Sequence, residues 1–460
     1  MLDPQVLKDT LNEVFTTEGM DYADLYIELS RTTSIQIEDG KVEKVLQGGD
    51  SGGGLRALSG GKTSYAYTNA LDEKALSGMA SELKSAVKSG YAASIDLRRK
   101  EPRVDFPIRT DPAGVSLDRK VAIMKEAERA ARGYDKSIRQ VSVTYRELHQ
   151  RVQIASSDGF LAEDERLQTI FLVNVVAESG GVVQTGYEPV GGFLGFELFD
   201  EISAPELARK AARKAVMMLK ARRAPGGRRP VVISSEAGGT MIHEAIGHGL
   251  EADLANQGLS VYSGKLGRKI AADIVTVLDD ATLPGKRGSF RFDDEGVPSQ
   301  KTVLVLNGVL QSFMYDRLQA MKAGSESTGN GRRQSYRHRP IPRMTNTLIA
   351  PGKTAPEEIL KGTPQGLFVK KMGGGQVNTL TGDFVFDVQE GYLIENGQLG
   401  EPVRGATLAG NGPRVLMEID MVGSDLGFSI GTCGKDAQGV PVSDAQPTIR
   451  VPELVVGGAS

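Results

Sequence analysis

Two histidines flank a glutamate near the middle of the chain, in the stretch HEAIGH at positions 243–248. A regular α-helix turns by about 100° per residue, so side chains five positions apart point about 140° away from each other. His243 and His248 can therefore share one metal ion only if the helix between them is distorted. On a regular helix they are ordinary polar residues near a helix end, and the motif alone leaves both interpretations open.

A single widened turn would bring the two imidazoles together. The zinc-binding motif HExxH places its histidines four apart, about 40° from each other on a regular helix. In a π-type turn the i→i+5 pairing aligns residues that are five apart instead. Gly247 lowers the resistance to such a distortion, because it has no side chain. The sequence therefore predicts that a metal site here requires a bulged helix.

A catalytic zinc needs three protein ligands and one open position, so a third ligand must come from elsewhere. Cys433 is the one cysteine of the chain, and the glycines around it would let the backbone approach a metal. Glu251 is the rival candidate, because it follows His248 by three residues and lies on the same side of a helix. Asp253 is a weaker candidate. At this point Cys433 and Glu251 both remain open.

The composition indicates a globular protein of the cell interior. The chain has 460 residues, a formal net charge of −3 and one cysteine. This charge gives no basic field that would attract nucleic acid or a membrane surface. The N-terminus does not resemble a signal peptide, and no apolar run approaches the roughly 20 residues that span a bilayer. A single cysteine cannot form an intrachain disulfide, which fits a reducing compartment. We therefore expect a cytoplasmic protein with no nucleic-acid and no membrane partner.

The pattern of predicted elements favours an α+β fold in two domains. Apolar residues at helical spacing predict helices at about 4–18, 72–89, 117–132 and 205–222, with strand-like stretches around them. The dipeptides Asp39-Gly40, Asn307-Gly308 and Asn396-Gly397 are typical of hairpin turns. The stretch 222–230 cannot continue a helix and is interpreted as an exposed linker. We expect a mixed α/β N-terminal domain at 1–224, with antiparallel strands and helices. A β-rich C-terminal domain at 229–460 would carry the metal-site helix.

A basic stretch at 332–343 contains five arginines, with an aromatic residue and a histidine between them. Arginines and aromatic rings together suit phosphate or RNA binding, and they also suit a structural loop held by its own ion pairs. The acidic turn at 293–295 has two interpretations as well. It could support the metal site, or it could be a solvated turn.

Several blocks of the sequence resemble the TldD/PmbA family, in its metal-bearing TldD branch. They cover essentially the whole C-terminal half in the family's order, and a looser match, GGGLRA at 52–57, lies in the N-terminal half. The metal-less PmbA (TldE) branch lacks the central motif and is the poorer match. The blocks are MIHEAIGHGLEAD at 241–253, FDDEGVP at 292–298, RRQSYRH at 332–338, PRMTNT at 342–347, VRGATL at 403–408 and GTCGKD at 431–436.

The resemblance implies a zinc-dependent peptidase that acts on linear, unfolded peptides in a site enclosed between subunits. It implies that Zn²⁺ is bound by His243, His248 and Cys433, and that Glu244 is the general base. In that setting the basic stretch would line the cleft and bind the peptide through Arg332, Arg333 and Arg337. His338, followed by Tyr336, would be the first candidate for stabilising the oxyanion.

The resemblance also implies a dimer, formed either with a second copy or with a metal-less PmbA/TldE-type subunit. Two other functions stay open. Family members have been named as modulators of DNA gyrase, so the chain could be a regulatory or binding protein without turnover. It could also be a zinc hydrolase of a non-peptide amide.

Overall fold

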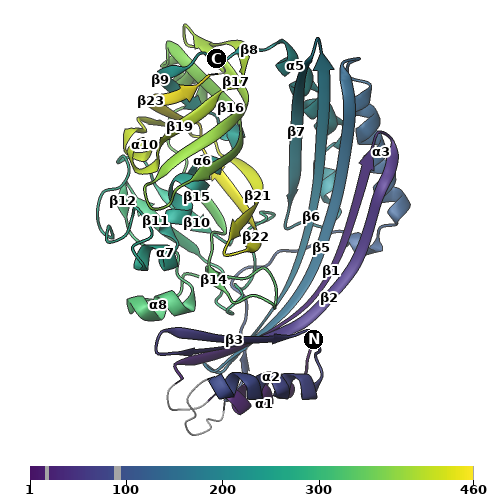
Figure 1. Cartoon of the computed structure of the whole chain (residues 1–460), viewed down its shortest axis with the longest axis vertical. Helices are drawn as coiled ribbons and strands as arrows, with labels where there is room; N and C mark the ends of the chain where they lie inside the picture. Colours follow the sequence, from purple (N-terminus) through teal and green to yellow (C-terminus); the bar gives the residue numbers. More distant parts are fainter. Residues whose placement is uncertain (16–19, 87–94, 459–460) are drawn as a thin grey trace.

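The computed structural model describes residues 1–15, 20–86 and 95–458 (Figure 1). A long, curved sheet forms one side of the molecule, and a compact β-rich part lies against its inner face. Helices lie on the outer face of the sheet, away from the β-rich part. The arrangement confirms the predicted α+β class. The division into domains at 1–224 and 229–460 stays a prediction.

The long sheet has seven strands in the order β3-β2-β1-β5-β6-β4, with β7 paired to β6. Its two longest hairpins are antiparallel, and the turn between β1 and β2 is the predicted Asp39-Gly40, with φ of 46° and 79°. Gly40 suits this position because it accepts a positive φ without strain. The strands are β1 (Tyr22–Glu38), β2 (Lys41–Ser59), β3 (Lys62–Thr68), β4 (Arg98–Arg99), β5 (Ile138–Ser156), β6 (Phe160–Ser179) and β7 (Val182–Gly192).

Helices cover the two ends of the outer face. At one end α3 and α5 bury their apolar sides against residues such as Ile35 and Phe171, and at the other end α1 and α2 pack on Leu25 and Leu55. The four predicted helices are therefore confirmed, although residues 16–19 and 87–94 lie outside the described ranges. The helices are α1 (Pro4–Val14), α2 (Glu73–Ala86), α3 (Leu117–Arg132) and α5 (Ala204–Lys220); the short α4 (Leu198–Glu201) precedes α5.

The β-rich part contains a six-stranded sheet in the order β12-β11-β10-β15-β22-β21. The predicted turn Asn307-Gly308 joins β11 to β12, with φ of 47° and 80°. The last strand, β21, has β22 as its neighbour. The strands are β10 (Val277–Asp280), β11 (Lys301–Leu306), β12 (Val309–Leu310), β15 (Asn346–Ile349), β21 (Gly427–Lys435) and β22 (Gln438–Gln446).

An eight-stranded sheet packs against the six-stranded one, and the predicted metal-site helix lies in the core between them. The order is β16-β9-β23-β19-β17-β18-β8, with β20 paired to β23, and the turn Asn396-Gly397 joins β17 to β18 as predicted. The strands are β8 (Arg222–Arg223), β9 (Gly227–Ile233), β16 (Gln365–Val377), β17 (Asp383–Glu395), β18 (Gln398–Arg404), β19 (Thr407–Asn411), β20 (Met421–Val422) and β23 (Ile449–Gly457). Smaller elements are β13 (Gly331–Arg332), β14 (Ile341–Pro342), α7 (Ala252–Asn256), α8 (Arg317–Ala323), α9 (Pro356–Lys361) and α10 (Gly412–Glu418).

The stretch 222–230 differs from its prediction as a free linker. Its first residues form β8, which pairs with β18, and its last residues begin β9, which pairs with β23. Arg222 and Arg228 form exposed ion pairs with Glu401 and Glu453. Proline and arginine content identified the end of the preceding helix correctly, but strand pairing with partners more than 170 residues away is not visible in the local sequence.

Buried ion pairs join the long sheet to the β-rich part. Arg56 of β2 contacts Asp24 of β1, and its Nη1 donates to Oε1 of Glu295 at 2.7 Å. Arg166 of β6 donates to Oδ1 of Asp294 at 2.7 Å. The acidic turn 293–295 is therefore neither a solvated turn nor a support of the metal site. It binds arginines of the long sheet, because charges removed from water need partners.

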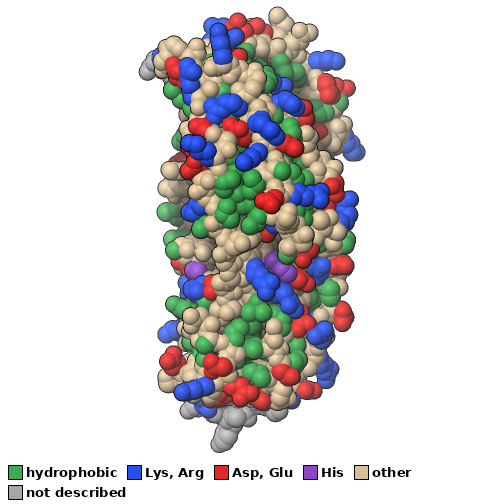
Figure 2. All heavy atoms as spheres, turned by 90° about the vertical axis from the view of Figure 1, so that its right-hand side faces the viewer, with side chains coloured by type: hydrophobic (Ala, Val, Ile, Leu, Met, Phe, Trp, Pro, Cys, Tyr) green, Lys and Arg blue, Asp and Glu red, His purple; other side chains and the backbone are tan. Residues whose placement is uncertain are grey.

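The outer face of the molecule carries charges of both signs (Figure 2). Basic and acidic side chains are interspersed there, and the hydrophobic side chains form small separate groups. Such mixing gives no extended field of one sign on this face. Among the helices of the described residues, each is too short or too polar to cross a bilayer.

Candidate metal centre

The helix that carries the two histidines is widened between them. It begins as α6 (Thr240–Ile242), continues as a π-helix at His243–Gly247 and ends in a 3-10 turn at His248–Leu250. The backbone N–H of His248 donates to the carbonyl of His243, which is the i→i+5 pairing of a π-turn. The two imidazole rings lie with their centroids 5.0 Å apart. The predicted bulge is confirmed.

Two residues explain why this segment adopts the widened turn. A Cβ on Gly247 would lie 2.2 Å from Sδ of Met344, so a larger residue here requires that buried side chain to shift. The φ of Gly247 is −53°, an ordinary helical value, so glycine is required here for space and not for backbone freedom. The buried hydroxyl of Tyr262 donates to the carbonyl of Ala245 at 3.0 Å and supplies that oxygen with a partner.

Cys433 reaches the two histidines from β21, on the edge of the six-stranded sheet. Its Sγ lies 3.6 Å from Nε2 of His248. One ligand atom from each of His243, His248 and Cys433 lies within 4.8 Å of the other two. Within the described part of the chain, these residues form the one such group of histidine, cysteine or carboxylate side chains.

Each imidazole is oriented by a carboxylate on its Nδ1. Oδ1 of Asp444, on β22, lies 2.6 Å from Nδ1 of His243, and Oε2 of Glu251 lies 3.0 Å from Nδ1 of His248. Fixing one ring nitrogen in this way directs the other toward a metal and raises its basicity. Glu251, the rival third ligand, therefore has an orienting position instead.

Asp253, the weaker ligand candidate, also has another partner. Nζ of Lys435 donates to Oδ1 of Asp253 at 2.7 Å and to Oε2 of Glu251 at 3.0 Å. This ion pair closes the far side of the site, two residues along β21 from Cys433. Burial alone raises the pKa of Glu251. The positive charges of Lys435 and His248, of which Lys435 has the larger effect, lower it to about 2 and keep the carboxylate charged.

The electrostatic setting favours the thiolate form of Cys433. Burial alone raises the pKa of this thiol, but hydrogen bonds with His243 and His248 bring it down to about 5. A thiolate and two imidazoles are the donor set that zinc and other soft or borderline metals prefer. The residues present therefore fit a bound metal ion, and the carboxylates on both imidazoles strengthen the fit.

A cleft of about 500 Å³ opens beside these residues, and His243, Glu244 and Cys433 line it. Glu244 follows His243 directly and is partly exposed, and burial raises the pKa of its carboxyl. Residues 189–191 of β7 and 428–433 of β21 form parts of its walls. In the described part of the chain both strands have a partner on one side only, so the cleft lies between two sheet edges.

The basic stretch 332–343 does not line this cleft in the part of the chain that the structure describes. The guanidinium of Arg332 donates to the carbonyls of Met344 and Pro441 at 2.6 and 2.7 Å. Arg333 donates to the carbonyl of Asp294 at 2.7 Å. Both arginines are buried and donate to backbone carbonyls inside the protein, so the predicted substrate-binding role has no support in their position.

The remaining predicted residues of this stretch contact the long sheet or each other's neighbours. Tyr336 is fully buried, and its hydroxyl donates to Oδ1 of Asp50 at 3.1 Å. Arg337 donates to the same oxygen at 3.1 Å. Nδ1 of His338 lies 3.0 Å from the hydroxyl of Ser335. The segment therefore makes an ion pair and a hydrogen bond to the long sheet, as expected for the structural alternative, and the oxyanion role of His338 and Tyr336 stays a prediction.

Arg343 is a site-supporting residue that the sequence did not single out. It is fully buried, and its Nη2 donates to the carbonyl of Cys433 at 2.5 Å, while Nη1 donates to the carbonyl of Gln438 at 3.2 Å. It therefore holds both strands of the β21–β22 hairpin near the thiolate. Asp444 was missed as well, because only the pairing of β22 with β21 brings it beside the histidine helix.

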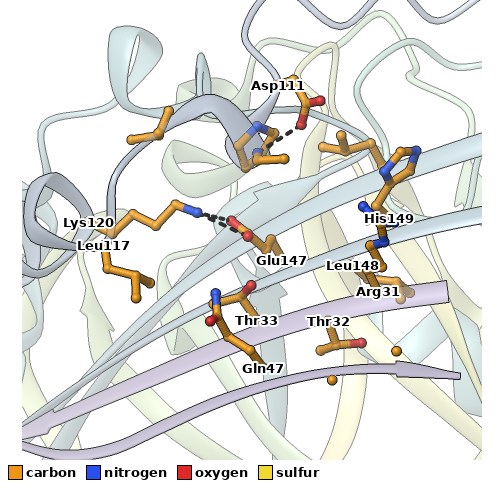
Figure 3. A pocket seen from close by; sticks show the side chains of 16 residues that line it. Arg31, Thr32, Thr33, Gln47, Asp111, Leu117, Lys120, Glu147, Leu148 and His149 are labelled. Carbon is orange, nitrogen blue, oxygen red and sulfur yellow. Dashed lines mark hydrogen bonds and ion pairs between the residues drawn. The ribbon is translucent and has the colours of Figure 1, made fainter.

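A second cavity, of about 610 Å³, lies on the outer face of the long sheet near the start of α3 (Figure 3). Its charged groups are largely paired with each other or with the backbone. Lys120 and Glu147 form an ion pair at 2.8 Å, and Oδ1 of Asp111 accepts the N–H of Ala113. Nε2 of His149 contacts Glu165 at 2.5 Å. In the described residues this cavity contains no group of converging ligands comparable to the metal centre.

Family models match most of the chain. Residues 226–458 match the PmbA/TldA metallopeptidase C-terminal domain, residues 110–219 its central domain and residues 23–94 its domain 1. A Haemophilus influenzae protein named metalloprotease TldD homolog is 37% identical over 97% of this chain and 95% of its own length. A Saccharolobus solfataricus protein named zinc metalloprotease TldD homolog is 32% identical over 70% of this chain and 72% of its own.

Solved structures show the same fold. A Thermotoga maritima protein described as a candidate modulator of a DNA gyrase has a TM-score of 0.82 and 23% identity, over 98% of this chain and 100% of its own. TldE from Thermococcus kodakarensis has a TM-score of 0.77 and 18% identity, over 96% of this chain and 98% of its own. At these identities the likeness concerns the fold alone.

Proposed function

This chain belongs to the PmbA/TldD metallopeptidase family, and on that premise we propose that it is a zinc-dependent peptidase that hydrolyses linear, unfolded peptides. The observation that carries the proposal is the convergence of a thiolate and two imidazoles within 4.8 Å at the edge of a cleft that Glu244 also lines.

His243, His248 and Cys433 are the residues that would hold the ion. The relative from Saccharolobus solfataricus is named a zinc metalloprotease, and the donor set suits zinc. A bound zinc ion supplies a water activated at neutral pH and a positive charge that polarises the carbonyl of a peptide bond. Asp444 and Glu251 keep the imidazoles in the orientation that this binding requires.

Glu244 is the proposed general base. Its carboxylate accepts the proton of the attacking water and passes it to the nitrogen of the leaving amine. Two observations support this role: Glu244 directly follows one proposed ligand in the chain, and its side chain lines the cleft in a partly buried position. Partial burial raises its pKa, which makes it a better proton acceptor than an exposed carboxylate.

An extended peptide is the substrate that suits the walls of this cleft. A sheet edge binds an added strand through backbone hydrogen bonds and therefore requires an unfolded segment. The edges of β7 and β21 both border the cleft. The carbonyls of Gly431 and Cys433 already accept hydrogen bonds from Arg287 and Arg343, so a peptide would pair with the remaining backbone groups of β21.

We also propose a dimer, formed with a second copy or with a metal-less PmbA/TldE-type subunit, in the cytoplasm. The likeness to a TldE structure supports the second arrangement at the level of fold. A thiolate ligand supports a reducing compartment, where thiols persist. Co-purification from the source cell followed by a mass measurement distinguishes the homodimer from the heterodimer.

A regulatory protein without turnover is the second candidate, favoured by the description of the Thermotoga maritima neighbour. A hydrolase of non-peptide amides is the third. The deciding experiment incubates the zinc-loaded chain and its Glu244→Ala variant with an unstructured peptide and with small amides. Peptide cleavage that is lost in Glu244→Ala while zinc is retained supports the peptidase. Cleavage that is unchanged in the variant contradicts the role of Glu244, and turnover of small amides alone favours the third candidate.

A further inference from the structure

A lysine at one end of the cleft has an ammonium group without a carboxylate partner among the described residues. Lys286 lines the same cleft as His243 and Glu244. In the described ranges its Nζ forms no ion pair, and burial lowers its pKa. The carboxylate whose charge reaches it is Glu201, and that residue forms an ion pair with Arg109 at 2.8 Å.

The ammonium is held in place by an aromatic ring. Nζ of Lys286 lies 3.9 Å from the centroid of the Phe428 ring, at the start of β21. A ring face attracts a cation and offers no negative charge to neutralise it, so the ammonium stays available for an anion. The side chain is therefore positioned, partly desolvated and unpaired.

A tight turn carries Lys286 and packs against the end of β7. The turn before it is closed by a hydrogen bond from the N–H of Lys286 to the carbonyl of Leu283, and Gly285 has a φ of 70°. A Cβ on Gly192, at the end of β7, would lie 2.0 Å from the carbonyl oxygen of Gly285. The turn therefore touches the last residue of β7 directly and closes this end of the cleft.

The distance along β21 relates Lys286 to the metal centre. Phe428, beneath the ammonium, precedes Cys433 by five residues in the same strand. With about 3.3 Å per residue, these positions are roughly 17 Å apart, the length of about five residues of an extended peptide.

We propose that Lys286, seated on Phe428, binds a carboxylate of the peptide substrate about four to six residues from the bond that is cut. The carboxylate belongs to an aspartate or glutamate side chain, or to the C-terminus of the peptide. This inference rests on the proposed function, since it assigns a substrate preference to the same cleft.

The test uses fluorescein-labelled 12-residue peptides, rich in serine and alanine, in which one glutamate is moved from position to position. Each is compared with its glutamine counterpart, and both free-acid and amidated C-termini are made. Binding to the zinc-loaded Glu244→Gln chain is measured by anisotropy, and the cut is mapped with the wild-type chain by mass spectrometry. We expect the glutamate peptide to bind about tenfold more tightly at one position, as for a hydrogen bond to a charged group.

Three variants locate the effect. In Lys286→Met the glutamine-to-glutamate ratio of Kd falls to about one, whereas Lys286→Arg keeps the ratio of the wild type. Lys371→Met removes one positive charge from the β16 wall of the cleft, and we expect it to keep the ratio of Kd seen in the wild type. A preference confined to free-acid peptides identifies the C-terminal carboxylate as the source, and a preference that survives amidation identifies the side chain.

A ratio near one at every position with both C-termini, or a ratio that persists in Lys286→Met, overturns the proposal. If Lys286→Met and Lys371→Met lose the preference for glutamate equally at all positions, the preference comes from the overall positive charge of the cleft, and the proposal is overturned as well. The proposed function is judged separately: cleavage without acidic preference contradicts only the subsite, and Lys286-dependent binding without cleavage contradicts only the peptidase.

Discussion

Oδ1 of Asp444 lies 2.6 Å from Nδ1 of His243, on the strand beside the one that carries Cys433. One hairpin of the six-stranded sheet therefore supplies both a proposed metal ligand and the group that orients another. Removing such an orienting carboxylate weakens metal binding about 10–100-fold. We expect Asp444→Ala to weaken zinc binding by this factor, measured in a competition titration against a chelator.

Asp444→Asn is the matched control, because its amide oxygen can still accept a hydrogen bond from Nδ1. Its loss of affinity is expected to lie between those of the wild type and Asp444→Ala. Wild-type affinity in a folded Asp444→Ala chain would show that the carboxylate does not orient the histidine.

Arg343 links the basic stretch to the metal centre through the carbonyl of Cys433. In Arg343→Met two buried carbonyls lose their donor, and each unpaired group destabilises the fold by about 1–3 kcal/mol. We expect a lower midpoint of urea unfolding and a lower zinc affinity. Arg339→Met is the control, because Arg339 is half exposed and 3.4 Å from Asp436, and we expect it to change stability by no more than about 0.5 kcal/mol. Equal stabilities of the two variants would contradict the assigned role.

Gly247 and Met344 form a contact that the widened turn depends on. A methyl group at position 247 overlaps Sδ of Met344, and overpacking of this kind destabilises by about 1–3 kcal/mol. We expect Gly247→Ala to lower both the unfolding free energy and the zinc content. In the double variant Gly247→Ala/Met344→Ala part of the zinc content should return, because the overlap is gone. Additive losses in the double variant would indicate that the glycine is needed for another reason.

Asp316 makes the stability of the protein depend on pH. It lies near Glu295, one of the buried charges that join the β-rich part to the long sheet. Burial, followed by the charge of Glu295, raises the pKa of Asp316 to about 8 in the folded chain. The folded state therefore binds a proton that the unfolded state has released. The contribution is fully present below the unfolded pKa, near 4, and is lost as the pH rises through about 8.

The asparagine variant tests this sign. Asp316 caps α8 by accepting the N–H of Gln319 at 2.7 Å, and an asparagine oxygen can do the same. Between pH 5 and 8 we expect the unfolding free energy of Asp316→Asn to fall less steeply than that of the wild type, by up to about 1.4 kcal/mol per pH unit. Parallel pH profiles would mean that Asp316 is ionised in the folded chain.

Local sequence patterns predicted the features that depend on neighbouring residues. A metal ion shared by His243 and His248, five residues apart, required a widened turn, and the structure contains one. The three hairpin dipeptides form turns for a similar reason, since they need a positive φ that their residues tolerate. The meeting of Cys433 with the histidines was expected from the family resemblance and not from spacing.

Long-range partners account for what the sequence could not predict. The arginines of 332–343 looked available for a ligand, yet Arg337 binds Asp50, almost 290 residues earlier, and Arg333 binds the acidic turn. A charge is visible in the sequence, whereas its partner depends on how the strands pair. For the same reason the stretch 222–230 resembled a linker although β8 and β9 lie in a sheet.

The central claim is that His243, His248 and Cys433 bind one zinc ion together. X-ray absorption at the zinc edge of the loaded chain tests it most directly, because sulfur and nitrogen ligands differ in distance, at about 2.3 Å and about 2.0 Å. We expect one sulfur and at least two nitrogen ligands in the wild type, and no sulfur in Cys433→Ala. A zinc site without a sulfur ligand in the wild type would contradict the account.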